Sequence, residues 1–287
     1  MTDLREVLRA QPGSTRLAGI DPRATPGLPA AGATGDDPKA WSRTEVTAIS
    51  RELAAYQERL FASAKEGGND RRVLLLLQAM DCGGKDGTVR NVTQAMSPAG
   101  MKAVSFGPPT EEERRHDFLW RIRRALPSAG YVGIFNRSHY EDVLVVRVHG
   151  LVGEDEWSRR YDLINEFEAE QAAGGLVMVK VMLHISKPEQ KKRLLARLDD
   201  PSKHWKYNPG DLAERARWDD YQRAYEDALN RCSTDVAPWY VVPADRKWYR
   251  NWAVATLLRD AFAELDPQYP EPDFDVAEER AKLRAAP

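Results

Sequence analysis

The chain has little cysteine, no long apolar run and almost no net charge. Its two cysteines, Cys82 and Cys232, are far apart in the sequence and lack metal-type spacing, which fits a reducing compartment better than a disulfide framework. The longest apolar run, residues 73–77, is far shorter than the roughly 20 residues that cross a bilayer, and no apolar signal segment opens the sequence. We therefore expect a cytoplasmic protein without a membrane partner.

The balance of charge limits the kind of ligand. Lysine and arginine number 42 and aspartate and glutamate 44, so the formal net charge is -2. A site for a polyanion must therefore come from local clustering of basic residues and not from the field of the whole protein. Nucleic acid is not an expected partner. With 287 residues, 42% of them hydrophobic, the chain can bury one large core.

Composition along the chain suggests three parts. Residues 13–39 are rich in proline, glycine and alanine, so we expect residues 1–45 to form an extended arm that wraps around the core or a partner subunit. Residues 46–270 form the main domain, and residues 271–287 a charged tail. Leu53, Tyr56, Leu60 and Phe61 have helical spacing, which predicts an amphipathic helix leading into the core, with Thr44 as a candidate cap.

The main domain alternates strands with helices. Buried-type strands are predicted at 72–79, 102–106, 131–135, 176–185 and 239–242. Helical patterns lie near 88–97, 110–126, 154–172, 188–199, 211–231 and 247–265. This order predicts an α/β fold with a parallel sheet covered by helices on both faces. Ligands of such sheets bind beyond the carboxyl ends of the strands, so the loops there are the candidate sites.

The first of these loops, in "LLLLQAMDCGGKDGTVR", resembles a phosphate-binding loop with two residues missing. In the pattern G-x-x-x-x-G-K-[ST], Ala79 replaces the first glycine and Asp86 replaces the Ser or Thr that holds magnesium. Gly83, Gly84 and Lys85 remain at a strand-to-helix turn, where free N–H groups and a lysine can face an anion. The alternative is a glycine-rich turn whose aspartates cap the next helix.

A carboxylate can take over the metal-binding role of the missing hydroxyl. Asp81 and Asp86 flank the loop, and oxygen ligands suit a hard cation such as Mg²⁺.

The second loop, "GIFNRSHYED", places Asn136 and Arg137 at the end of the next central strand. Arginine is suited to bidentate contact with phosphate and to the charge that develops on a transferring phosphoryl group. Glu141 and Asp142 follow; either can bind a metal, and an exposed acid near a capped helix is the alternative for each. His139 has no ligand partner at useful spacing, so we expect a structural role for it.

The third element is a basic helix followed by a break at "DDPSK". Such a segment can act as a lid that folds over phosphates and excludes water, and we place this lid at about 197–215. Arg197, Lys203 and Lys206 lie near the break and are the better candidates for anion contact. Lys191 and Lys192 are more typical of a solvated helix face.

A second basic cluster lies after the second strand. If residues 110–126 form one helix, Arg114, Arg121 and Arg124 share a stripe, whereas Phe118 and Ile122 face the core. Basic residues on several elements indicate either a long anion or simple balancing of surface charge.

Four segments together resemble a known family: "QAMDCGGKDGTVRNV", "GPPTEEERRHDFLWR", "GIFNRSHYEDVLVVRVH" and "RLDDPSKHWKYNPGD". They are similar to the family-2 polyphosphate kinases, whose fold is related to that of thymidylate kinase. The resemblance covers roughly residues 73–252, and the phosphate loop of that family has the form A-x-D-x-x-G-K-D. Both departures from the standard loop are therefore typical of the family. The resemblance implies a three-layer P-loop kinase fold with a helical lid.

The resemblance also implies a reaction and a set of site residues. The terminal phosphoryl group of inorganic polyphosphate passes reversibly to AMP or ADP, or to guanine nucleotides, with Mg²⁺ or Mn²⁺ as cofactor. Asp81, Lys85 and Arg137 are implied as catalytic, and Asp81 and Glu141 as metal ligands. Phosphate or nucleotide binding is assigned to Gly83, Gly84, Asp86, Gly87, Thr88, Asn136, Arg197, Lys203 and Lys206. Asn136, in place of an aspartate, resembles the branch acting on both nucleoside mono- and diphosphates.

Three alternatives remain open from the sequence. One is a nucleoside monophosphate kinase that uses ATP as donor, and a second is a non-catalytic protein that binds polyanions. The third transfers phosphate to an acceptor that is not a nucleotide. The arm makes a homodimer or homotetramer plausible.

Overall fold

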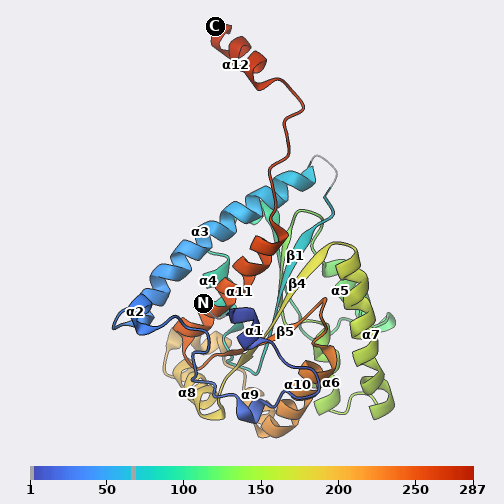
Figure 1. Cartoon of the computed structure of the whole chain (residues 1–287). Coiled ribbons are helices and arrows are strands. Elements are labelled where there is room, and N and C mark those ends of the chain that lie inside the picture. Colours follow the sequence, from blue (N-terminus) through green and yellow to red (C-terminus); the bar gives the residue numbers. More distant parts are fainter. Residues whose placement is uncertain (1–2, 66–68) are drawn as a thin grey trace.

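The protein is built around a parallel sheet between two layers of helices (Figure 1). The computed structural model describes residues 3–65 and 69–287. The strands are β1 (Arg72–Ala79), β2 (Met101–Ser105), β3 (Val132–Asn136), β4 (Leu176–His184) and β5 (Trp239–Pro243), in the order β2-β3-β1-β4-β5. All neighbouring strands are parallel. β1 is central and buried on both faces, which explains its unbroken apolar sequence.

Helices cover both faces of the sheet. On one face α4 (Lys85–Val92) and α11 (Lys247–Leu265) lie near the strands, and the long α3 (Pro38–Lys65) packs on α11. α11 is therefore buried on most sides, with Leu257, Leu258 and Phe262 in the core. On the other face lie α6 (Val145–Val148), α7 (Glu154–Ala173) and α10 (Trp218–Cys232). α8 (Lys187–Leu198), the 3-10 helix η5 (Pro201–Lys206) and α9 (Asp211–Ala216) form the segment predicted as a lid.

The predicted strands are confirmed to within one or two residues, but several helix predictions were wrong. α3 begins at Pro38, with the Asp37 carboxylate accepting from the backbone N–H groups of Lys39 and Ala40, so Thr44 is not its cap. The helix predicted at 88–97 is α4, which starts and ends earlier. The helix predicted at 211–231 is broken at Arg217 into α9 and α10.

The helix predicted at 110–126 does not form as one unit. Only a short 3-10 turn, η3 (Glu113–Arg115), and α5 (Trp120–Ala125) are helical. Arg121 turns inward, is buried, and donates to the carbonyl oxygen of Gly107 at 2.9 Å. The predicted stripe of Arg114, Arg121 and Arg124 is therefore absent.

The N-terminal region packs against the core. α1 (Leu4–Leu8) buries Leu4 and Leu8, and Leu17 is buried further along. Arg9 forms an antiparallel bridge with Tyr240, and the N–H of Ala10 donates to the carbonyl of Trp239 at 2.8 Å. This pairing covers part of the edge of β5, which would otherwise present unpaired backbone groups. The region continues past α10 before it reaches α2 (Ala31–Thr34) and α3 (Figure 1).

The C-terminal tail leaves the body of the protein. α12 (Val276–Ala285) stands away from the sheet and its helices in Figure 1. Phe274, Val276 and Leu283 are exposed apolar side chains on this tail. None of the described helices is long and apolar enough to cross a membrane.

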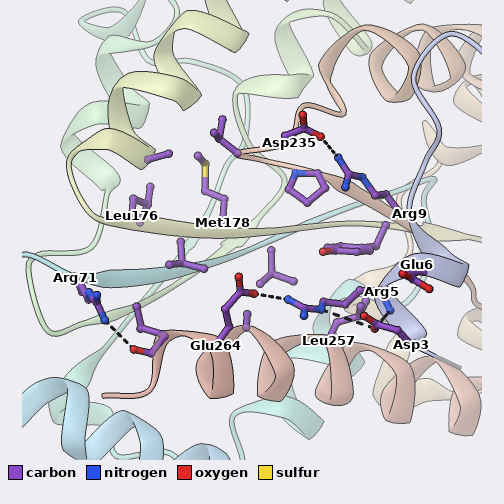
Figure 2. Close-up of a pocket in the computed structure, with 18 of the residues that line it drawn as sticks. Asp3, Arg5, Glu6, Arg9, Arg71, Leu176, Met178, Asp235, Leu257 and Glu264 are labelled. Carbon is purple, nitrogen blue, oxygen red and sulfur yellow. Dashed lines mark hydrogen bonds and ion pairs between the residues drawn. The ribbon is translucent and has the colours of Figure 1, made fainter. Parts of the chain in front are cut away.

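A cavity of about 660 Å³ lies at the amino end of β4 and β5, the edge opposite the loops named above (Figure 2). Its charged side chains are largely paired with one another. Arg5 lies 2.5 Å from Glu264 and Arg9 lies 2.6 Å from Asp235. Positive and negative side chains are therefore balanced in this cavity.

Candidate active site

The phosphate-type loop connects β1 to α4 in a tight turn. Gly84, with φ 104°, is in the left-handed region that favours glycine, and α4 begins at the next residue. A Cβ atom at Gly83 would lie 2.8 Å from the carbonyl oxygen of Met80, so this position also excludes a side chain. The N–H of Gly83 donates to that same oxygen at 2.9 Å. The two glycines are therefore required by the turn.

Lys85 is the first residue of α4 and points back across the loop. Its Nζ donates to the carbonyl oxygen of Ala79 at 3.0 Å. Burial, and then the nearby Arg137, lower the pKa of Lys85, with Asp81 and Glu141 opposing the shift. A cation held in this way gains stability when an anion binds beside it.

Arg137 is brought to the loop by the register of the sheet. Leu77 of β1 pairs with Asn136 of β3, and the N–H of Arg137 donates to the carbonyl of Leu77 at 3.0 Å. The guanidinium lies 3.2 Å from Asp81 and 3.4 Å from Glu141. Glu141 is the main reason that the pKa of Arg137 is raised. The backbone of Arg137 has φ 64°, an unusual conformation for a residue with a side chain.

Asp86 joins the loop to two other elements. Its carboxylate accepts from the side-chain amide of Asn136 at 2.9 Å and lies 3.6 Å from Nζ of Lys206 in η5. The first turn of α4, the end of β3 and the segment after α8 therefore meet at one carboxylate.

A cavity of about 330 Å³ opens above the glycines, and its charge is strongly one-sided. Two acidic residues, Asp81 and Asp86, line it together with seven basic ones: Lys85, Arg193, Arg197, Lys203, Lys206, Lys247 and Arg250. Burial, and then Arg193, lower the pKa of Arg250 to about 10. Like charges gathered in a half-buried cavity destabilise one another, so the site favours a polyanion.

Most of the chain matches one protein family. The model described as "Polyphosphate kinase 2 (PPK2)" matches residues 39–270. The chain belongs to the polyphosphate kinase 2 family.

Relatives and solved structures agree with this assignment. An "AMP/ADP-polyphosphate phosphotransferase" of Meiothermus ruber is 50% identical over 225 residues, which is 78% of this chain and 82% of that protein. An "ADP-polyphosphate phosphotransferase" of Rhodopseudomonas palustris is 43% identical over 231 residues, 76% of this chain and 78% of that protein. The crystal structure of polyphosphate kinase 2 from Arthrobacter aurescens matches with a TM-score of 0.93 and 53% identity, covering 99% of this chain and 97% of that one. The predicted P-loop kinase fold is confirmed.

The structure brings most of the predicted site residues of this polyphosphate kinase 2 family member together. Asp81, Gly83, Gly84, Lys85, Asp86, Gly87, Arg197, Lys203 and Lys206 line the basic cavity. Asn136, Arg137 and Glu141 lie beside it, at the end of β3. Thr88 is fully buried within α4. Its hydroxyl donates to the carbonyl of Gly84 one turn earlier, at 3.2 Å, and does not line the cavity.

Two cations of the lid segment are also engaged within the protein. Arg197 donates to the carbonyl of Lys206 at 2.8 Å and lies 3.4 Å from Asp211. Lys203 lies 2.5 Å from Asp200 at the surface. Both side chains also line the cavity, so each can leave its partner within the protein to contact an anion.

Sequence reasoning did not assign Lys247 and Arg250 to the site. Both lie in the first two turns of α11, directly after β5, whose carboxyl end faces the same edge as the loop. A Cβ atom at Gly84 would lie 1.9 Å from Nη1 of Arg250, so this guanidinium covers the glycine turn. The signal was present in the sequence, because a basic residue at the start of a helix after a parallel strand meets the ligand edge.

His139 has the structural role that the sequence predicted. It is buried with Glu168, which also accepts from Tyr140 at 2.9 Å and lies 2.5 Å from Lys180. Burial lowers the pKa of His139, which keeps the ring neutral. Burial alone would raise the pKa of Glu168, but Lys180 and His139 outweigh it, and the pKa falls. Through His139 and Tyr140, this network fixes the start of the loop after β3.

A further cavity, of about 360 Å³, lies beside Asp142, the residue after Glu141. It is lined by Phe118, Arg121, Asp142 and Arg160, among others. Arg160 lies 2.9 Å from Asp142. Burial, opposed by Arg160 and Arg121, raises the pKa of Asp142 to about 6.

The two predicted metal ligands suit a magnesium ion. Asp81 and Glu141 both contact the guanidinium of Arg137, so two carboxylates converge beside the phosphate loop. Among residues 3–65 and 69–287, no group of three or more metal-ligating His, Cys, Asp or Glu side chains is found. Mg²⁺ commonly binds one or two carboxylates and completes its shell with water and substrate phosphates, so this donor set fits.

Proposed function

We propose that this protein transfers the terminal phosphoryl group of inorganic polyphosphate to AMP and ADP, reversibly, to give ADP and ATP. The observation that carries the proposal is the cavity with seven basic and two acidic side chains, set over the glycine turn of the phosphate-type loop. The names of the relatives from M. ruber and R. palustris support the same reaction. A polyphosphate chain carries far more negative charge than a mononucleotide, and this cavity offers matching cations.

The side chains supply position and charge. In the transfer, the bond between the terminal phosphorus and the bridging oxygen of polyphosphate breaks, and a phosphate oxygen of the acceptor forms the new bond. Lys85 and Arg137 stabilise the charge that spreads over the moving group. The proposed roles of Arg197, Lys206 and Arg250 are to hold the rest of the donor in line, because two highly charged anions must meet end to end.

Mg²⁺ is the proposed cofactor, with Mn²⁺ as a substitute, and Asp81 and Glu141 are the proposed ligands. When bound, the ion neutralises phosphate oxygens and orients them for the transfer. Asp81 and Glu141 both pair with Arg137, which places the two carboxylates close together. We therefore expect activity to disappear when divalent ions are removed with a chelator and to return when Mg²⁺ is added.

Acceptor use is the finer part of the proposal. Asn136 is neutral and lies next to Asp86, so it repels the phosphates of an acceptor less than an aspartate would. The test is a coupled assay with polyphosphate, Mg²⁺ and AMP, ADP, GMP or GDP. If ADP gave ATP but AMP stayed unchanged, the proposed use of both acceptors would be wrong. GMP and GDP test whether guanine nucleotides are also accepted.

The same assay separates the alternatives. A nucleoside monophosphate kinase would phosphorylate AMP from ATP and ignore polyphosphate. A non-catalytic polyanion-binding protein would bind polyphosphate and give no nucleotide product with any acceptor. An enzyme that uses a different acceptor would consume polyphosphate only when that compound is added.

We also propose that the chain forms a homodimer or homotetramer in the cytoplasm. The tail supports the first part: a helix of 10 residues with exposed Phe274 and Leu283 is marginal in water without a partner. The two free cysteines support the second, because thiols persist in a reducing compartment. Light scattering and cell fractionation test these two proposals.

A further inference from the structure

Arg193 differs from the other cations of the basic cavity because its hydrogen bonds are saturated by the protein. A guanidinium has five N–H donors. In Arg193, Nε donates to Glu189 at 2.8 Å, and Nη1 to the carbonyls of Cys82 and Gly83 at 3.0 and 3.1 Å. Nη2 donates to the carbonyls of Ala244 and Asp245 at 2.6 and 3.2 Å. No donor is left for a phosphate, so Arg193 links the phosphate loop to the residues after β5.

The backbone after β5 that accepts from Arg193 is also hydrogen-bonded to two other segments. The carboxylate of Asp245 accepts from the N–H and the hydroxyl of Ser186, at 2.9 and 2.8 Å. The N–H of Asp245 donates to the carbonyl of Pro22 at 3.1 Å, and His184 contacts the carbonyl of Ile20 through Nε2 at 3.2 Å. Ile20 and Pro22 belong to the N-terminal region, more than 50 residues before the loop in sequence.

We call residues 13–26 the strap. Its two ends are held by side chains of α10 and α11. The side-chain amide of Asn230 in α10 makes two hydrogen bonds to Thr15, of 2.8 and 3.0 Å, and Glu226 accepts from the N–H of Leu17 at 2.8 Å. At the other end, Tyr249 donates to the carbonyl of Pro26 at 2.6 Å. The family match begins at residue 39, so it assigns no role to the strap.

We propose that the strap and Arg193 together position the phosphate loop. The strap holds the backbone after β4 and β5 in place. Nη2 of Arg193 donates to the backbone after β5, and Nη1 donates to the carbonyls of Cys82 and Gly83. The backbone of Cys82 has φ 62°. A residue with a side chain keeps this left-handed conformation only when surrounding contacts hold it there. Arg193 is thus a positioning residue. The loop's part in phosphoryl transfer rests on the proposed function; the coupling between strap and loop does not.

Hydrogen exchange of the ligand-free, full-length chain tests the coupling directly. The probes are the amides of Gly83 and Thr88, which donate within the loop to Met80 and Gly84. Asn230→Ala, and the double variant Asn230→Ala/Glu226→Ala, release the strap without altering any residue of the cavity. We expect faster exchange both in the strap and at the two loop amides, and a fall in kcat/KM of about 10-fold to 100-fold, the scale for misplaced catalytic groups.

The matched control is Asn165→Ala. Asn165, in α7, also donates its side-chain amide to a backbone carbonyl, that of Arg231, at 2.9 Å, but among the described residues it makes no hydrogen bond to the strap. We expect wild-type exchange at Gly83 and Thr88 in this variant. Arg193→Lys keeps the charge with only three donors, and we expect it to speed loop exchange while strap exchange stays as in wild type.

Two results would overturn the proposal. One is a double variant whose strap exchanges faster while the loop amides and kcat/KM match wild type; the strap would then be only a cover. The other is unchanged strap exchange in the double variant, because Asn230 and Glu226 would then not hold it. If the wild-type chain transferred no phosphate with any acceptor, the proposed function would fail, but the exchange results would still decide the coupling.

Discussion

Arg137 and Asp81 come from different strands and meet at 3.2 Å, with Glu141 3.4 Å from the same guanidinium. This arginine therefore pairs with both of the carboxylates proposed to bind magnesium. Asp81 and Glu141 would hold a magnesium ion here, and Arg137 would supply a guanidinium to phosphate.

Asp81→Asn keeps the shape of the side chain and removes its charge. We expect kcat to fall about 100-fold to 1,000-fold, the range found when one preorganised electrostatic contact is lost, and the Mg²⁺ concentration for half activity to rise. A magnesium titration of the steady-state rate measures both. Asp235→Asn is the control, because Asp235 is fully exposed and pairs with Arg9 at the opposite edge. Equal Mg²⁺ requirements in wild type and Asp81→Asn would remove Asp81 from the metal site.

Arg250 gives a test of the basic cavity. Its guanidinium makes side-chain hydrogen bonds only to Asn251 among the described residues, and burial beside Arg193 lowers its pKa to about 10. Polyphosphate should therefore relieve repulsion and raise Tm, by a shift equivalent to about 2.7 kcal/mol at 100 times Kd. Arg250→Ala should weaken binding by about 10-fold to 150-fold, since hydrogen bonds to charged groups contribute roughly 1.5–3 kcal/mol. Thermal shift assays at increasing salt measure this.

The control for Arg250 is Arg223→Ala, because Arg223 lies on the exposed side of α10 and pairs with Asp220. Added salt should shrink the Tm shift of wild type. A shift that Arg250→Ala leaves intact would place the polyanion elsewhere.

His184 gives a pH dependence of stability. Burial lowers its pKa in the folded protein, with Asp245 and Asp21 opposing the shift. As the pH falls through the unfolded value of about 6.5, the unfolded chain takes up the proton first, so the free energy of unfolding decreases by up to about 1.4 kcal/mol per pH unit. His139 contributes with the same sign.

His184→Gln keeps a donor for the carbonyl of Ile20 and removes the titration. Its unfolding free energy should therefore fall less than that of wild type between pH 7 and pH 5, as measured by urea titrations at each pH. His204→Gln, at an exposed position, should behave as wild type. Parallel curves for wild type and His184→Gln would contradict the buried, neutral state of this ring.

The C-terminal tail predicts a change in assembly. Phe274→Asp with Leu283→Asp places charges on the exposed apolar residues of the tail and should lower the mass measured by light scattering. Lys282→Ala, on the same helix, is the control. An unchanged mass in the double aspartate variant would mean that these side chains do not hold subunits together.

Much of the fold could be predicted because parallel strands buried on both faces have unbroken apolar sequences, as residues 73–77 show. The glycine turn and the strand-end arginine could also be predicted, since both depend on local sequence and on the rule that strand ends share an edge. The helix start at Asp37 could also be predicted, because aspartate followed by proline is typical of the first residues of a helix.

The remaining features depend on contacts between distant segments. Arg121 looked like a surface residue of an amphipathic helix, but it is buried and donates to the carbonyl of Gly107. Arg193 lies on the predicted basic helix, yet the backbone carbonyls that it contacts lie about 50 and 110 residues away. No periodicity in the sequence contains that information, because hydrogen bonds to backbone carbonyls do not depend on which side chains the partner residues carry.

Cys82 and Arg137 are two of the three non-glycine residues with positive φ among the described residues. At each, glycine would relax the backbone by about 1 kcal/mol. Directed evolution that selected only for heat resistance would therefore favour glycine at both positions. At position 137 that change would remove the guanidinium between the carboxylates, so such a selection would erode the phosphate site before the rest of the protein.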